Sequence, residues 1–199
     1  MKKYFFILML ASVSAYSQEN YAVNSLNAFA DSVDALIKNS TGDAGELMVS
    51  TVSVNRNESA IGMQNTKLSY YYFQMDDSVY EIDGALSFMP RYSDPLVIMA
   101  EYNIAASQTV VVYYYIQGNN LLYRSISTGG HGYTNSAYWI KDQELIRFEE
   151  RNSMIGSKHV VQEDKFSKEV YSNGMLVMDH LKDHLKLYYD IFKVSGIDK

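Results

Sequence analysis

Aromatic and aliphatic residues between Thr109 and Phe148 recur in a pattern that predicts two successive β-hairpins. The first hairpin covers Tyr114–Leu122 and the second covers Tyr138–Ile146. Each contains paired aromatic residues, an isoleucine, a polar connection with Gly or Asp, and then a pair of aliphatic residues. Aromatic and β-branched side chains suit a pleated sheet surface, and Gly, Asn and Asp adopt the backbone angles of tight turns. The pattern therefore predicts an antiparallel meander.

Other stretches of the chain predict additional strands and the connections between them. Asp76–Ser78 is expected to be a hairpin turn, and residues 55–66 a loop or a weak hairpin. The segment Ser87–Pro95 contains both prolines of the chain, and proline cannot donate to a sheet ladder, so we expect a loop there. Runs of apolar, aromatic and hydroxyl-bearing residues predict strands over 46–54, 68–75, 79–82 and 96–104.

A helical period predicts one helix near each end of the chain. Residues 21–38 carry apolar side chains at intervals of three and four, with Asn, Asp and Lys on the other side. A second helix is predicted from Met175 onward, and Asn173-Gly174 before it is either a hairpin turn or the end of a short helix. The apolar stripe of the second helix contains Met178, Leu181, Leu185, Tyr188 and Phe192.

These elements together predict an α+β fold. We expect a curved antiparallel meander sheet of about six to eight strands, with the N-terminal and C-terminal helices packed on one face. A half-barrel that holds a helix and a flatter sheet crossed by both helices both fit the pattern. No linker rich in Pro or Ser divides the chain, so residues 18–199 are expected to form a single domain.

The first seventeen residues have the order of a cleaved signal peptide. Lys2 and Lys3 are followed by an apolar run over 4–13 and by the small-x-small sequence Ala15-Tyr16-Ser17. The apolar run is shorter than the ~20 residues that span a bilayer. We expect cleavage after Ser17 and export of the mature chain to the periplasm or the extracellular space.

Composition limits the classes of partner and anchor. The chain contains no cysteine, so it cannot be a cysteine-anchored lipoprotein or hold disulfides. Its net charge is −6, which becomes −8 when residues 1–17, with two lysines and no acid, are removed. An acidic chain disfavours nucleic acid as a partner. No later apolar run is long enough to predict a membrane span.

Three histidines are candidates for chemistry. His180 and His184 lie four residues apart on the predicted C-terminal helix, a spacing that allows both imidazoles to bind one metal ion. Leu181 follows His180, so the glutamate of the metalloprotease motif is missing, and hydrogen-bonded boundary histidines are the commoner meaning of this spacing. His131 lies in a glycine-rich segment, Gly129–Gly132, which is typical of a hairpin connection and favours recognition over catalysis.

Tyrosine is unusually frequent, with eighteen residues beside Trp139. Tyrosine combines a flat apolar ring with a polar tip, so rows of outward-facing rings could bind a sugar, an apolar ligand or a protein. Cross-strand aromatic ladders that only stabilise the sheet are the alternative for any single tyrosine. We predict a binding face formed by Tyr113, Tyr115 and Trp139 and by the loop that carries His131 and Tyr133.

The sequence favours a binding protein of the cell envelope that has no catalytic activity and needs no cofactor. It contains neither a Gly-x-Ser-x-Gly motif nor a phosphate-binding loop. The expected partner is a protein, a glycan or an apolar small molecule. One alternative is a carrier that holds a lipid-like ligand between the curved sheet and the helices, since ten methionines suit an adaptable pocket. The other alternative is a metal-dependent enzyme that uses His180 and His184.

Overall fold

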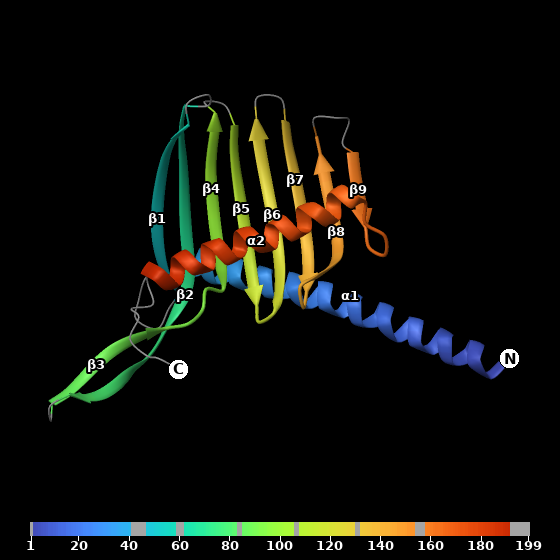
Figure 1. Ribbon diagram of the computed structural model, residues 1–199, viewed down its shortest axis with the longest axis horizontal. Coiled ribbons are helices and arrows are strands. Elements are labelled where there is room, and N and C mark those ends of the chain that lie inside the picture. The colour runs from blue at the N-terminus through green and yellow to red at the C-terminus, as the bar shows by residue number, and fades with distance from the viewer. Residues whose placement is uncertain are drawn as a thin grey trace.

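The computed structural model places an antiparallel sheet between two long helices, one on each of its faces (Figure 1). The structure describes residues 2–40, 47–58, 62–82, 85–105, 108–129, 132–153 and 158–191. In chain order the elements are α1 (Lys2–Asn39), β1 (Leu47–Glu58), β2 (Gly62–Ile82), β3 (Ala85–Tyr92), β4 (Val97–Ala105), β5 (Gln108–Gln117), β6 (Asn120–Gly129), β7 (Gly132–Lys141), β8 (Glu144–Asn152), β9 (Lys158–Gln162) and α2 (Lys168–Ile191).

The sheet is an open meander, as the sequence predicts. Its hydrogen-bonding order is β1-β2-β4-β5-β6-β7-β8-β9, and every neighbouring pair is antiparallel. Strand β3 pairs only with the distal part of β2, and this hairpin projects beyond the end of the sheet (Figure 1). The predicted α+β meander is therefore confirmed.

Both central hairpins form where the sequence predicts them. Strands β5 and β6 are joined through Gly118, which has a positive φ of 61°. Strands β7 and β8 are joined through Asp142 and Gln143, whose φ values are 49° and 71°. In the β7–β8 connection both central residues thus have positive φ, the geometry of a two-residue turn whose twist matches the strands that it joins.

The two helices lie on opposite faces of the sheet, so the prediction that both pack on one face is wrong. Tyr114 is buried with residues of α2, whereas its neighbour Tyr115 is buried with residues of α1. Successive side chains of a strand point to opposite faces. Strands β5 to β8 carry large apolar side chains on both faces, and each face needs a cover to exclude water.

The local corrections concern β2 and β3. Asp76–Ser78 is not a turn, because β2 continues through it with an irregularity of register between Met75 and Ser78. Most of the segment 87–95 is strand and not loop, since β3 runs to Tyr92. Pro90 falls where the register shifts and faces no partner residue in the ladder. An edge position of this kind tolerates a residue that cannot donate a hydrogen bond.

Of the two alternatives predicted for residues 55–66, the hairpin is correct and the loop is wrong, because residues 55–58 pair with residues 62–65 as the ends of β1 and β2. A further correction lengthens α2. Asn173-Gly174 neither turns nor ends a helix, because α2 begins at Lys168 and runs through it. Ser167 caps this helix by accepting a hydrogen bond from the Val170 amide at 3.2 Å.

Gly174 lies where α2 packs against Tyr138 of β7 and Leu145 of β8. It is buried, and a Cβ built on it would lie 3.4 Å from Leu145 Cδ2 and 3.6 Å from Tyr138 Cδ1. Both distances are ordinary van der Waals contacts, so there is room for one methyl group and little more. The sequence suggested a break at this glycine because a mid-helix Gly costs about 1 kcal/mol relative to Ala.

Two glycine-to-alanine substitutions are expected to change stability in opposite directions. Gly174→Ala should raise the free energy of unfolding by about 0.5–1 kcal/mol, because it restores helix propensity in a space that accepts the methyl group. Gly118→Ala should lower it by about 1–2 kcal/mol, because φ of +61° is strained for a residue with Cβ although no atom lies within 4 Å. Urea denaturation of both variants tests this contrast, and equal signs would contradict it.

Candidate functional site

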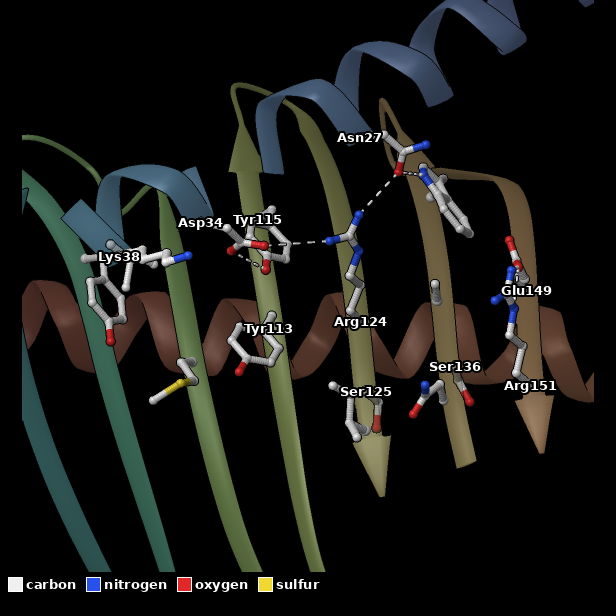
Figure 2. A pocket seen from close by; sticks show the side chains of 17 residues that line it. Asn27, Asp34, Lys38, Tyr113, Tyr115, Arg124, Ser125, Ser136, Glu149 and Arg151 are labelled. Atoms are coloured by element: carbon white, nitrogen blue, oxygen red, sulfur yellow. Dashed lines mark hydrogen bonds and ion pairs between the residues drawn. The ribbon is translucent and has the colours of Figure 1, made fainter. Parts of the chain in front are cut away.

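A pocket of about 770 Å³ lies on the α1 face, between α1 and the part of the sheet that α1 leaves uncovered (Figure 2). We call it the α1 pocket. Strands β5 to β8 form most of its floor, and one side of α1 forms its upper wall. It is lined by Asn27, Asp34, Ile37, Lys38, Tyr71, Met99, Tyr113, Tyr115, Arg124, Ser125, Ile126, Asn135, Ser136, Ala137, Trp139, Glu149 and Arg151.

Three of the predicted binding residues lie together in this pocket. Tyr113 and Tyr115, two residues apart on β5, stack with ring centroids 6.0 Å apart and planes at 15°. Tyr115 and Trp139 are almost fully buried, whereas Tyr113 is half-buried and contributes accessible ring surface. The first two are therefore structural supports of the pocket, and Tyr113 is the ring most available to a ligand.

The polar side of α1 holds the two buried rings in place. The Tyr115 hydroxyl donates a hydrogen bond to Asp34 Oδ1 at 2.7 Å, and Trp139 Nε1 donates to Asn27 Oδ1 at 3.2 Å. Burial is the main cause that raises the pKa of Tyr115, and the adjacent Asp34 carboxylate raises it further. The Tyr115 hydroxyl therefore stays protonated and acts as a donor throughout the physiological pH range.

Arg124 lies at the centre of the α1 pocket, beside Tyr113 in the β5–β6 register. Its guanidinium carbon is 5.3 Å from the centroid of the Tyr115 ring, within cation–π range. Figure 2 shows the guanidinium between Asn27 and Asp34 of α1. Its Nη2 lies 3.5 Å from Asn27 Oδ1, and its Nη1 lies 3.9 Å from Asp34 Oδ2. Both contacts are at the long limit for hydrogen bonds and ion pairs. The side chain remains 32% exposed, so its donors are accessible from the pocket.

The β8 end of the pocket carries a network of charges centred on Glu149. Its carboxylate receives hydrogen bonds from His159 at 2.8 Å and from Arg151 at 3.2 and 3.3 Å, and Arg147 Nη2 lies 3.6 Å away. Burial acts to raise the pKa of Glu149, but the hydrogen bonds from His159 and Arg151 outweigh it, and the pKa is lowered. Arg147 also pairs with Glu163. Glu149 is therefore ionised and fully engaged at neutral pH.

Arg151 connects the α1 pocket to a second, smaller pocket of about 270 Å³. This second pocket is lined by Tyr133, Arg151, Asn152, Ser153, Lys158 and His159. Tyr133 is half-exposed, and its amide donates a hydrogen bond to Ser153 Oγ at 2.8 Å. Tyr133, predicted to lie in a loop, is part of β7 and lines the neighbouring pocket, apart from Tyr113, Tyr115 and Trp139. His131 lies outside the described residues.

The two histidines of the metal hypothesis lie on α2, across the sheet from the α1 pocket. His180 is exposed, whereas the His184 ring contacts Tyr114 edge-on with centroids 5.4 Å apart, and its Nε2 is 3.4 Å from the Tyr102 hydroxyl. Burial and the neighbouring His180 lower the pKa of His184 to about 4, against an opposing effect of Asp183. Within the described residues, no group of three His, Cys, Asp or Glu side chains is placed to hold a metal ion.

Several residues of the α1 pocket are absent from the sequence prediction. Arg124 could have been found from the first hairpin, because a two-residue connection at Gly118-Asn119 sets Arg124 opposite Tyr113. Asn27 and Asp34 belong to the side of the first helix that its pattern assigns to solvent. Their role depends on where the helix lies on the sheet, which the helix sequence alone does not define.

Comparison with protein-family models, with curated proteins and with solved structures found no match to this chain. Among the described helices, none has the length and apolar character needed to cross a bilayer. Function is therefore inferred from the side chains of the two pockets.

Proposed function

We propose that the protein is an exported binding protein of the cell envelope, without catalytic activity, that holds a ring-bearing ligand in the α1 pocket. The observation that carries the proposal is that Tyr113, Tyr115 and Trp139 line one pocket together with Arg124, whose accessible guanidinium lies over the Tyr115 ring. Export is proposed from the order of charged, apolar and small residues in the first seventeen positions.

The dimensions and rigidity of the α1 pocket support binding. Its volume of about 770 Å³ falls within the range of ~300–1,000 Å³ typical of small-molecule sites. Its rings belong to strand residues, and the hydrogen bonds that Tyr115 and Trp139 donate to Asp34 and Asn27 of α1 fix two of them before any ligand binds. Rings that are already ordered lose little conformational entropy when a ligand stacks on them.

The titrating groups of the pocket support binding over catalysis. A general acid or base works best when its pKa lies near the operating pH. The lowered pKa of Glu149 and its hydrogen bonds to two basic side chains make that carboxylate a poor proton acceptor. Asp34 is engaged by the Tyr115 hydroxyl.

The apolar-carrier alternative would use the same pocket. Ile37, Met99 and Ile126 supply apolar surface, but Arg124, Arg151 and Glu149 line the same space. A wholly apolar ligand would bury these charges without compensating hydrogen bonds, which is unfavourable. We therefore favour a ligand that has polar groups as well as a ring.

Binding is expected to depend on Tyr113. A panel of mono- and oligosaccharides, aromatic acids and fatty acids can be screened by thermal shift and by the fluorescence of Trp139, the single tryptophan. We expect a ring-bearing compound to raise the melting temperature and change the emission, because Trp139 lines the pocket. Tyr113→Ala should weaken binding of that compound by about 5- to 150-fold, since stacking on an aromatic side chain typically contributes ~1–3 kcal/mol.

The matched control is Tyr171→Ala, which removes an exposed tyrosine from α2 on the opposite face. This variant should bind the compound with the affinity of the unmodified chain. Equal losses in the two variants would argue against the α1 pocket, and a response to fatty acids alone would favour the carrier function.

A further inference from the structure

Arg124 is positioned to accept an anion. Its guanidinium is laid against the Tyr115 ring, and its contacts to Asn27 and Asp34 are long, at 3.5 Å and 3.9 Å. Asp34 uses its other oxygen for a short bond of 2.7 Å from Tyr115, so the carboxylate is held by the tyrosine more closely than by the arginine. A guanidinium with accessible donors binds a carboxylate through two parallel hydrogen bonds.

Asn135 offers an acceptor in the same pocket. Its Oδ1 is buried and has no hydrogen-bond partner among the described residues. It pairs in register with Ile126 on one side and with Arg151 on the other, and all three line the α1 pocket. A buried carbonyl oxygen without a donor is unfavourable, so the Asn135 side chain would gain a hydrogen bond by rotating its amide toward a ligand hydroxyl in the pocket.

Tyr113 supplies the third feature, an accessible flat ring next to Arg124. A fatty acid has the carboxylate but no hydroxyl donors, and a neutral sugar has the hydroxyls but no anion. A carboxylated sugar presents an apolar C–H face, hydroxyl groups and an anion on one small unit. It therefore matches the ring of Tyr113, the Asn135 oxygen and the Arg124 guanidinium together.

We infer that the ligand of the α1 pocket is an acidic saccharide of the uronate type, whose carboxylate binds Arg124 and whose ring stacks on Tyr113. This inference rests on the proposed binding function. Because Arg151 lines both pockets, a second acidic unit reaches the smaller pocket beside Lys158 and His159. The site thus takes a short oligosaccharide and not only a single sugar.

Isothermal titration calorimetry of the full mature chain at neutral pH and low salt tests this inference. The probes are trimers of galacturonate, mannuronate and guluronate and a glucuronate-containing hyaluronan tetrasaccharide, with maltotriose as the neutral counterpart. At least one uronate oligomer should bind tenfold or more tightly than maltotriose. Its affinity should fall as salt is raised, because a charge-assisted contact accessible to solvent is screened.

Arg124→Gln should reduce the affinity for that oligomer at least tenfold, a larger factor than its effect on any binding of maltotriose. Arg124→Lys, which keeps the charge and loses the paired donors, should recover only part of the affinity. The matched control is Lys182→Gln, which removes an exposed cation from α2 on the other face and should bind normally. Circular dichroism and thermal unfolding verify that each variant is folded.

The outcomes separate this inference from the proposed function. If no uronate oligomer binds, or if acidic and neutral oligomers bind equally and Arg124→Gln changes neither, the inference is overturned. If another ring-bearing compound still binds and depends on Tyr113, the proposed function stands without it. If Tyr113→Ala has no effect on any bound compound, the α1 pocket is not the site and both fail.

Discussion

Replacing Tyr188 by alanine is expected to lower the free energy of unfolding by about 3–5 kcal/mol, the range for deleting a large buried aromatic side chain. Tyr188 is fully buried where α2 meets β2, with ring centroids 5.3 Å from Tyr70 and 5.6 Å from Tyr72. Its hydroxyl donates to the Ser93 carbonyl at 2.9 Å. The substitution removes the packing of two neighbouring rings and leaves the Ser93 carbonyl without this donor. Guanidinium denaturation followed by circular dichroism measures the change.

Two control variants separate the contribution of the Tyr188 ring to stability from that of its hydroxyl and from the effect of replacing another tyrosine of α2. Tyr188→Phe keeps the ring and should lower the free energy of unfolding by about 0.5–1.5 kcal/mol, the usual contribution of one hydrogen bond. Tyr171→Ala changes a tyrosine of α2 that is 52% exposed and should change stability by no more than about 0.5 kcal/mol. If Tyr188→Ala were no more destabilising than Tyr171→Ala, α2 would not be held to the sheet through this ring.

Stability is expected to fall as the pH decreases from 7 to 5, because of His184. Burial and the nearby His180 lower its pKa to about 4 in the folded protein, compared with 6.5 for an unperturbed histidine. Between these values the unfolded chain binds a proton that the folded chain does not, so acid favours unfolding. Above pH 7 both states are neutral and the effect disappears. The expected loss is about 2 kcal/mol between pH 7 and pH 5, measured by urea denaturation at each pH.

The variant His184→Gln isolates this contribution. Glutamine cannot be protonated, so its stability curve should be flatter than that of the unmodified chain between pH 7 and pH 5. Glu149, whose pKa is lowered in the folded state, also loses stabilisation on acidification, but only as the pH falls below its ordinary value near 4.5. Identical slopes in the two proteins would show that His184 does not control acid sensitivity.

The strand pattern was predictable because it depends on local information. The hairpins at Gly118 and at Asp142-Gln143 follow from turn residues placed between period-two apolar runs. Which face of the sheet each helix covers could not be predicted in the same way. Tyr114 and Tyr115 are both apolar enough to be covered, so the alternation that normally distinguishes an inner from an outer face is lost.

Turn-forming residues misled the prediction where tertiary structure overrides them. Asp76-Asp77-Ser78 has the composition of a turn but lies in β2, where an irregular register accommodates it. Gly174 has low helix propensity but lies inside α2, where the helix packs against Leu145 and Tyr138 of the sheet. In both cases the local conformational preference of a few residues is outweighed by the hydrogen bonds and packing contacts of the whole strand or helix.

Only part of the candidate site could be predicted from the sequence. Tyr113, Tyr115 and Trp139 could be selected because ring-bearing residues on strands are conspicuous, and the structure places them in one pocket. Asn27 and Asp34 could not, because their contacts with the sheet depend on how α1 crosses β5 and β7. A polar residue on an amphipathic helix has no feature that distinguishes contact with a partner strand from contact with water.

The docking of α1 has a consequence for how the chain acquires its structure. Asp34 meets Tyr115 across 81 residues of sequence, and Asn27 meets Trp139 across 112. This helix is synthesised first, yet the surface it covers exists only after β7 has emerged from the ribosome or from a translocation channel. Contacts between such remote segments form slowly. A nascent chain would therefore carry α1 undocked until nearly three quarters of its length is free to pair, so the helix has to persist without its partner surface for most of synthesis.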